Sequence, residues 1–300
     1  MKDIAFKEIR IEDKEQLEFI LHKYAAFCLS AFTFASLISW ARVYNYQWAI
    51  LNDTLLIQLT TLEDNKKHLL QPVGEFPQKL QNSIVHYAFS LDYRLTIFGV
   101  SDAFIHNYPQ FISHFERTEH RDMDNYIYST EDLALLKGKK FQPKRNLLTQ
   151  FETNYNWTSE PISAENIPAC LEVINKIYNQ NELDINSYLA HEIKALDFVL
   201  HNFSTLKQQG ILIRVTNIPV ALSIYEHLNP STYVVHFEKA IRDYKGLYQL
   251  INRETAKIIL SKGRKYINRE EDLGIEGLRK AKLSYHPLEL CPAHALVFKK

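Results

Sequence analysis

The sequence has little of the residue on which nucleotide-binding and hydrolase loops depend. Its 300 residues include only eight glycines, and the patterns GxGxxG, GxSxG and the phosphate-binding Walker loop do not occur. Such loops need glycine for tight turns and for close approach of the backbone to a phosphate or nucleophile. This scarcity argues against dinucleotide-binding, P-loop and α/β-hydrolase functions.

Cysteine is also scarce. Cys28, Cys170 and Cys291 are odd in number and too widely spaced for a zinc knuckle or a redox pair. Histidines such as His114 and His120 lack partners at ligand spacing, so we predict no metal site. We therefore expect a reduced, cytoplasmic protein.

The sequence lacks a net charge, a secretory signal and a clear membrane span. Lys plus Arg and Asp plus Glu both number 35, so no global field draws the chain to DNA or an anionic bilayer. Residues 1–10 are too charged for a signal peptide. Residues 24–40 carry no charge, but serine and threonine dilute their hydrophobicity, so we expect a buried segment. An anionic partner must be met by a local patch.

The second half shows the clearest order of elements. Apolar residues recur at helical spacing in two stretches, and three later apolar runs are separated by turns rich in Asn and Pro, as in an antiparallel meander. The predicted strands are 157–163, 211–216, 220–226, 233–239, 265–268 and 293–299, and the predicted helices are 166–178, 187–206, 244–261 and 275–283. This order is typical of the GNAT acyltransferase superfamily.

The first half repeats nearly the same order. Its predicted strands are 5–10, 47–51, 55–61, 68–73, 95–100 and 125–129, and its helical segments are 14–24, 77–88 and 101–115. Residues 130–151 are expected to form a connecting helix that Gly138 and Pro143 interrupt. The sequence thus favours two copies of one fold in tandem, although the copies share no residue-level identity.

Several segments carry a resemblance to a known family. The chain resembles the bacterial phosphatidylglycerol lysyltransferase C-terminal-type family through residues 126–133, 136–140, 144–151, 237–246, 268–274 and 277–282. The resemblance implies an α+β fold of two tandem GNAT-like acyltransferase domains, each a mixed, mostly antiparallel sheet flanked by helices, as in the Fem-type peptidyltransferases. We place the domains at 1–140 and 141–300. Family members fused to membrane helices move an amino acid from aminoacyl-tRNA onto a lipid head group.

An acyltransferase of this fold needs an anion site for the donor, normally at the helix that follows the fourth strand. The corresponding residues here are Arg242, Tyr244, Lys245 and Gly246. The alternative is an ordinary helix start capped by Asp243. In the first copy Glu75 occupies the equivalent turn and would repel a phosphate, so we expect that copy to have lost donor binding.

Three residues are candidates for the chemistry. Glu238 is the preferred base, since it ends the fourth strand beside the proposed donor site. His236 shares its sheet face and is the alternate base, or a buried hydrogen-bonded histidine. Tyr266 is a candidate to protonate the leaving group, or a core tyrosine.

Two charged stretches are candidates for binding. Five cations fall within nine residues and suit RNA phosphates, a nucleotide donor or a solvated helix face; they are Lys137, Lys139, Lys140, Lys144 and Arg145. Glu271 and Asp272, in the acidic run 270–272, either orient an amine acceptor or end a strand.

These features favour an acyl- or aminoacyl-transferase without a tightly bound cofactor. Its donor is acyl-CoA or aminoacyl-tRNA, and its acceptor a small molecule, lipid head group or peptide with an amine or hydroxyl. The alternative is a non-catalytic protein whose decayed GNAT site recognises a peptide, lipid head group or RNA. The oligomeric state is not predicted.

Overall fold

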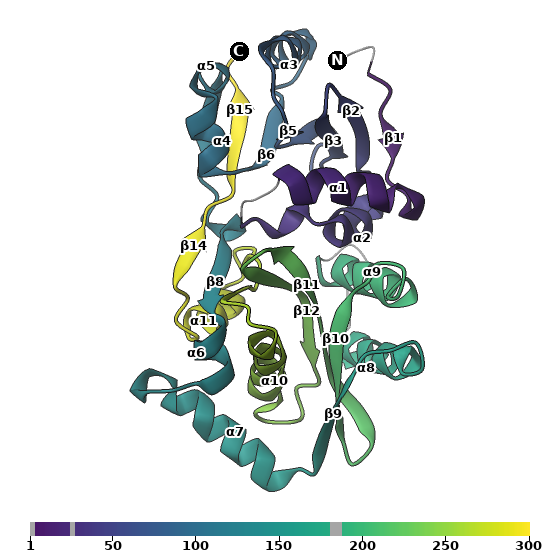
Figure 1. Ribbon diagram of the computed structural model, residues 1–300, viewed down its shortest axis with the longest axis vertical. Coiled ribbons are helices and arrows are strands. Elements are labelled where there is room, and N and C mark those ends of the chain that lie inside the picture. The colour runs from purple at the N-terminus through teal and green to yellow at the C-terminus, as the bar shows by residue number, and fades with distance from the viewer. Residues whose placement is uncertain (1–3, 25–27, 181–187) are drawn as a thin grey trace. The chain divides into compact units, whose positions relative to one another are not determined.

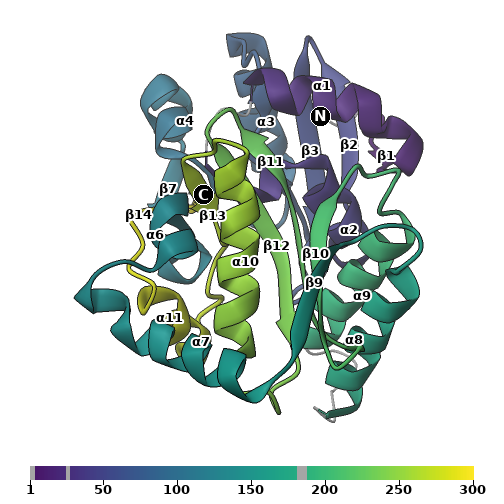
Figure 2. The same cartoon turned by 60° about the horizontal axis from the view of Figure 1, so that its bottom comes forward.

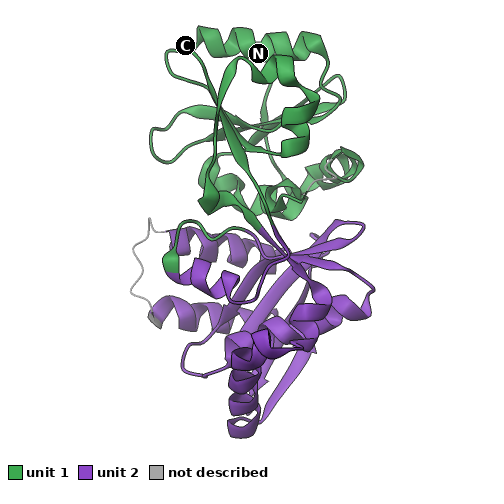
Figure 3. Cartoon of the chain, turned by 90° about the vertical axis from the view of Figure 1, so that its left-hand side faces the viewer, with its two compact units in different colours: residues 1–125, 271–276, 290–300 green, residues 126–270, 277–289 purple. Residues whose placement is uncertain are grey.

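The structure is a computed structural model that describes residues 4–24, 28–180 and 188–300 (Figure 1). The chain forms two compact units (Figure 3). Unit 1 comprises residues 1–125, 271–276 and 290–300, and unit 2 comprises residues 126–270 and 277–289. The chain thus enters unit 2 at residue 126 and not near 140, and two later segments return to unit 1.

Unit 1 is built on a mixed sheet in the order β1-β2-β3-β4-β6-β15-β7, with β5 paired to β3. Only β4 and β6 run parallel among the pairs that the structure describes there. The strands are β1 (Lys7–Glu8), β2 (Gln47–Leu51), β3 (Thr54–Thr60), β4 (Lys67–Leu70), β5 (Val73–Gly74), β6 (Thr96–Val100), β7 (Phe115–Thr118) and β15 (His294–Phe298). The helices are α1 (Lys14–Tyr24), α2 (Phe34–Tyr44), α3 (Gln78–Ser90), α4 (Asp102–Asn107) and α5 (Pro109–Ile112).

Local signals explain several of these boundaries. The Thr33 hydroxyl accepts from the Ser36 amide at 3.1 Å and so caps the start of α2. Asn52 and Asp53 both have positive φ, which matches the tight turn that joins the β2–β3 hairpin. The uncharged stretch expected to be buried contributes Phe34 and Leu37 of α2 to the core. No helix in the described part of the chain is long and apolar enough to cross a bilayer.

Unit 2 is built on a second mixed sheet, in the order β14-β8-β13-β12-β11-β10-β9. Helices α8 and α9 lie on one face and α6, α7 and α10 on the other (Figures 1 and 2). The strands are β8 (Asn125–Ser129), β9 (Trp157–Pro161), β10 (Gln209–Val215), β11 (Ile218–Asn229), β12 (Thr232–Ala240), β13 (Tyr266–Asn268) and β14 (Glu289–Cys291). The helices are α6 (Thr130–Leu135), α7 (Gln142–Asn154), α8 (Ile167–Gln180), α9 (Tyr188–His201), α10 (Leu247–Ser261) and α11 (Glu276–Leu283).

Two strands do not join the sheet that their place in the sequence suggests. Strand β8 was expected to close the first copy, yet it pairs with β13 in the second sheet. Strand β15 comes from the end of the chain, yet it lies between β6 and β7 in the first sheet. The fold is nevertheless the predicted one, with two mixed, mostly antiparallel sheets flanked by helices.

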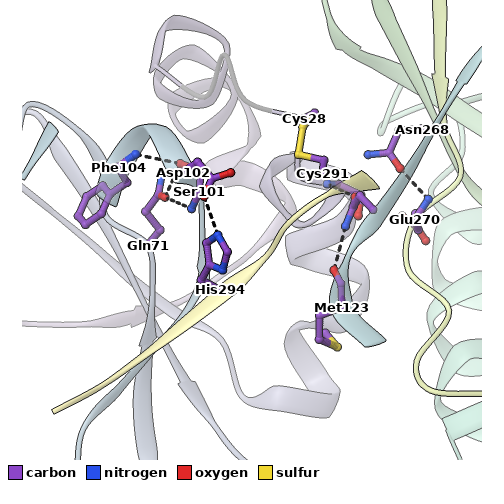
Figure 4. The surroundings of a disulfide bond; sticks show 12 residues. Cys28, Gln71, Ser101, Asp102, Phe104, Met123, Asn268, Glu270, Cys291 and His294 are labelled. Atoms are coloured by element: carbon purple, nitrogen blue, oxygen red, sulfur yellow. Dashed lines mark hydrogen bonds and ion pairs between the residues drawn. A yellow bond between two sulfur atoms is a disulfide. The ribbon is translucent and has the colours of Figure 1, made fainter. Parts of the chain in front are cut away.

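The structure joins Cys28 and Cys291 in a disulfide (Figure 4), so the expectation of a fully reduced chain is wrong for these two residues. The sequence did not suggest this pair because 263 positions separate its members, which both lie in unit 1, Cys291 at the end of β14. Cys170 stays free and buried, and burial raises the pKa of its thiol to about 12. The prediction of a cytoplasmic location rested partly on reduced cysteines. Disulfides are rare in the cytosol, so the Cys28–Cys291 bond removes that argument.

We expect removal of the disulfide to destabilise the protein. A cross-link between residues so far apart removes much conformational entropy from the unfolded chain, so Cys28→Ser should lower the free energy of unfolding by about 3–5 kcal/mol. Urea unfolding with and without reductant measures this loss. Equal stability of the oxidised and reduced protein would contradict the expectation.

Candidate functional site

The candidate site lies on unit 2 where β12 and β13 stop pairing. The parallel ladder joins Thr232 to Tyr266 and ends with Val234 opposite Asn268. After Val234 and Asn268, side chains connect β12 to the segment that follows β13. The prediction that His236 and Glu238 share a face of β12 assumed regular alternation, but β11 and β12 shift register at His236, between Val235 and Phe237, so the alternation is interrupted there.

The carboxylate of Glu238 is held in a buried ion pair. Arg269, directly after β13, donates through Nη2 to Glu238 Oε1 at 2.8 Å, and the two side chains are only 13% and 10% exposed. Burial disfavours the charged guanidinium, but the carboxylate of Glu238 outweighs it and raises the pKa of Arg269. Asn252 of α10 donates to Glu238 Oε2 at 3.4 Å, and with its amide turned over it accepts from Arg269 at 3.2 Å. Asn252 therefore contacts the pair in either orientation.

His236 lies between two carboxylates. Its Nε2 is 2.7 Å from Glu226 Oε1 on β11, and its Nδ1 is 2.7 Å from Glu270 Oε1. Burial alone would lower the pKa of His236, but the hydrogen bonds to Glu226 and Glu270 outweigh it and raise the pKa to about 10. At neutral pH this side chain is an imidazolium that donates from both nitrogens, so it has no lone pair with which to act as a base.

A local turn positions Glu270. The Asn268 side chain accepts from the Glu270 amide at 2.6 Å, and Glu270 has a positive φ of 58°. A side chain that bonds the backbone two residues on stabilises this kind of turn. The turn directs Glu270 toward His236 and Arg269 toward Glu238.

Tyr266 does not join this cluster. It lies beside Thr232, six residues before Glu238, which corresponds to about 20 Å along a strand. Its side chain is also among the exposed large hydrophobic residues of the chain. The role predicted for Tyr266 in protonating a leaving group at Glu238 is therefore not supported by the geometry.

The predicted donor loop lies between β12 and α10. Arg242 and Lys245 are exposed, while the Tyr244 ring packs against Tyr155 with centroids 5.2 Å apart. Gly246 is the N-cap of α10 with φ of 94°, and a Cβ there would lie 2.3 Å from the Leu147 carbonyl oxygen of α7. Close packing against the α7 backbone therefore accounts for a glycine at this position, and the predicted approach to a phosphate stays a prediction.

Substitution at Gly246 tests this packing. Gly246→Ala should lower the free energy of unfolding by about 2–4 kcal/mol, since a methyl group there meets backbone and the residue keeps a left-handed φ. Gly263→Ala is the matched control, with φ of 73° and open space around the added methyl, and should cost about 1 kcal/mol. Equal losses in urea titrations of the two variants would show that α7 yields to the methyl group.

The acidic run separates into different environments. Glu270 pairs with His236 in unit 2, whereas Asp272 is fully buried in unit 1 and pairs with Arg121 at 3.3 Å. Its carboxylate also accepts from the Gly274 amide at 2.9 Å. A buried, paired carboxylate cannot orient an acceptor amine, so that prediction is corrected for Asp272. Glu271 is partly exposed in unit 1.

The basic stretch is largely engaged within the protein. Lys137 pairs with Glu131 at 3.4 Å and Lys140 with Asp132 at 2.8 Å. Arg145 donates to the Gly138 carbonyl at 2.8 Å. Lys144 donates to Ser284 Oγ at 2.6 Å, and Lys139 is exposed. Four of the five cations thus bind different groups of the protein itself. These contacts weaken the prediction that the five form one surface for RNA phosphates.

Sequence reasoning missed the partners that define the site. Glu226, Asn252 and Arg269 come from different segments, and no spacing rule connects them. The available signal was a charged residue next to a short buried strand, as at Arg269. No group of residues suited to a metal ion occurs among the described residues.

Comparisons with known proteins agree with this architecture. A structure described as a conserved protein of unknown function from Bacteroides thetaiotaomicron is 33% identical, covers 99% of this chain and 100% of its own, and superposes with a TM-score of 0.89. The structure of L-PGS from Bacillus licheniformis is 16% identical, with coverage of 96% and 92% and a TM-score of 0.65. No curated protein matches the sequence.

More distant structures show the same fold. FemX superposes at 9% identity with a TM-score of 0.59, covering 98% of this chain and 97% of its own. A tandem GNAT protein from the clavulanic acid pathway superposes at 10% identity with a TM-score of 0.51, covering 99% of each chain. The family model described as phosphatidylglycerol lysyltransferase, C-terminal, matches residues 26–294. The chain therefore belongs to the phosphatidylglycerol lysyltransferase C-terminal family.

Proposed function

We propose that the chain transfers an acyl or aminoacyl group from a phosphate-bearing donor, an acyl-CoA or an aminoacyl-tRNA, to an amine or hydroxyl acceptor. The observation that carries this proposal is the family match over residues 26–294, together with two GNAT-like units. Fold alone does not determine function, so the chemistry must come from named residues.

Glu238 is the base in this proposal. The carboxylate removes a proton from the acceptor, directly or through a water, as the acceptor attacks the acyl carbonyl. The bond to the donor then breaks, and the leaving hydroxyl or thiol takes up a proton. Arg269 and Asn252 hold the carboxylate in place. His236 fits this role poorly because both of its nitrogens already donate to carboxylates.

Arg242 and Lys245 supply the charge for the donor. Both are exposed on the loop that precedes α10, so a phosphate can approach their side chains without displacing α7. The amide groups of the first turn of α10 add their dipoles. In this proposal Gly246 packs against α7 and does not contact the donor.

One observation favours a second candidate function. The Leu147 carbonyl occupies the space beside Gly246, and Arg269 neutralises Glu238, so both parts of the proposed centre already have protein partners. A decayed site that binds a peptide, lipid head group or RNA without turnover fits these contacts. Cytoplasmic location remains a prediction for either function.

Thermal unfolding with candidate donors tests donor binding. Coenzyme A, an acyl-CoA or a charged tRNA should raise the melting temperature by several degrees, and Arg242→Ala should reduce the shift. Lys257→Ala is the control, since Lys257 is an exposed cation of α10 that pairs with Glu254 away from the loop. No shift with any donor, or equal shifts in both variants, would contradict the donor site.

A further inference from the structure

Lys144 of α7 is a partly buried lysine that has no carboxylate partner. Its Nζ lies 2.6 Å from Ser284 Oγ and 4.1 Å from the centre of the Tyr285 ring. In the described part of the chain no Asp or Glu forms an ion pair with it, whereas Lys137 and Lys140 of the same basic stretch both pair with carboxylates. A buried charge normally has a partner of opposite sign, so the ammonium form of Lys144 lacks the usual compensation.

The groups around Lys144 favour its neutral form. The charged and titratable side chains that face it are Arg269, from the segment after β13, and Tyr285, from the residues that follow α11. The Arg269 guanidinium lies 5.2 Å from the centre of the same Tyr285 ring. Burial, and then the positive charge of Arg269, lower the pKa of Lys144. At a given pH more of this amine is therefore neutral than of an exposed lysine.

The Ser284 hydroxyl leaves the lone pair of the amine free. Ser284 Oγ donates to the Ala281 carbonyl oxygen at 2.6 Å, so its only hydrogen is already used. Toward Lys144 the hydroxyl therefore accepts, and it takes one N–H of Nζ. Lys144 is also partly open to solvent, so a small electrophile can reach the amine without a closed cavity.

We propose that Lys144 is a modification site whose ε-amine takes an acyl group from an activated donor, a thioester or an acyl phosphate. The lone pair of Nζ attacks the acyl carbonyl carbon, and an amide N–C bond forms. The C–S or C–O bond to the carrier breaks, its electron pair leaves with the thiolate or phosphate, and the nitrogen loses a proton to solvent. Partly desolvated lysines beside another cation are nucleophiles of this kind.

Acylation changes the charge beside the candidate site. The product amide is neutral, so the positive charge next to Arg269 is removed. The inference goes beyond the transfer reaction at Glu238, because the acyl group ends on the chain itself and not on an acceptor.

Acetylation by acetyl phosphate tests the site. The full chain is treated briefly at neutral pH, and the rate at each lysine is followed by mass spectrometry of its peptides. Lys144 should be acetylated about tenfold faster than Lys139, an exposed lysine of the same basic stretch. A rate at Lys144 equal to or below that at Lys139 would overturn the proposal.

A carboxylate introduced beside Nζ tests the cause of the reactivity. Ser284→Asp gives the ammonium an anionic partner and should lower the acetylation rate of Lys144 to that of Lys139. Ser284→Ala adds no charge and should leave Lys144 reactive, as should the control Ser261→Asp at the exposed end of α10. Undiminished acetylation of Lys144 in Ser284→Asp would also overturn the proposal.

Acetyl-CoA in place of acetyl phosphate separates the two sources of the acyl group. Labelling of Lys144 by acetyl-CoA identifies a thioester as donor, and labelling by acetyl phosphate alone identifies an acyl phosphate. Neither experiment contains an acceptor molecule, so failure of Lys144 to react is distinguished from failure of the chain to transfer an acyl group.

Discussion

Glu238→Gln is expected to lower the rate of acyl or aminoacyl transfer by about 10²- to 10⁴-fold, the range that a general base contributes. The amide keeps the size of the side chain and one acceptor oxygen for Arg269, but it cannot take a proton from the acceptor. Donor binding at Arg242 and Lys245 should persist. The measurement is single-turnover transfer of a labelled acyl group with donor in excess.

A matched control is an ion pair made by the neighbouring residue of the same strand. Glu192 of α9 forms a comparable ion pair with Lys239, the neighbour of Glu238 on β12, and its side chain is 17% exposed. Glu192→Gln should therefore change stability without changing the transfer rate. Similar rate losses in the two variants would mean that the Glu238 effect is structural.

Because His236 is charged in the folded protein, the free energy of unfolding should fall as the pH becomes alkaline. Its pKa is raised from 6.5 to about 10 in the folded protein, so its stabilising effect is complete below pH 6.5 and is lost as pH rises toward 10. At about 1.36 kcal/mol for each pKa unit, the free energy of unfolding should fall by about 3–5 kcal/mol over this interval. Urea unfolding at intervals of pH measures the slope.

A second variant separates His236 from other groups that titrate in this range. His236→Gln should unfold more easily at pH 6 and should lose most of the alkaline slope. His201→Gln is the control, because His201 is exposed and pairs with Asp197 on the surface of α9. An unchanged slope in His236→Gln would show that the imidazole is not charged between its two carboxylates.

Most elements of the fold could be predicted because local patterns define them. The hairpin across Asn52 and Asp53 follows from turn residues that accept positive φ. Ser129 caps α6 by accepting from the Asp132 amide at 3.2 Å, a local contact between residues three apart. The exchange of β8 and β15 between the sheets could not be predicted, since strand patterning does not specify a distant partner.

The candidate site was predictable only in part. Alternation along β12 predicted that His236 and Glu238 share a face, but the register shift at His236 interrupts that alternation, and strand patterning alone does not reveal such a shift. Their ion-pair partners are Glu226, Arg269 and Glu270, which only the tertiary fold brings near. Gly246 was assigned to a ligand because a glycine at a helix start suits phosphate and close helix packing equally well.

The central claim is that the chain transfers an acyl or aminoacyl group, and a transfer assay with aminoacyl-tRNA or acyl-CoA as donor tests it most directly. Purified chain, isotopically labelled aminoacyl-tRNA or acyl-CoA, and a panel of amine and hydroxyl acceptors are combined, and labelled product is followed by mass spectrometry. The account predicts product that depends on the chain and falls at least 100-fold with Glu238→Gln. Donor that binds tightly but yields no product with any acceptor, for wild type and variant alike, would contradict it and favour the binding function.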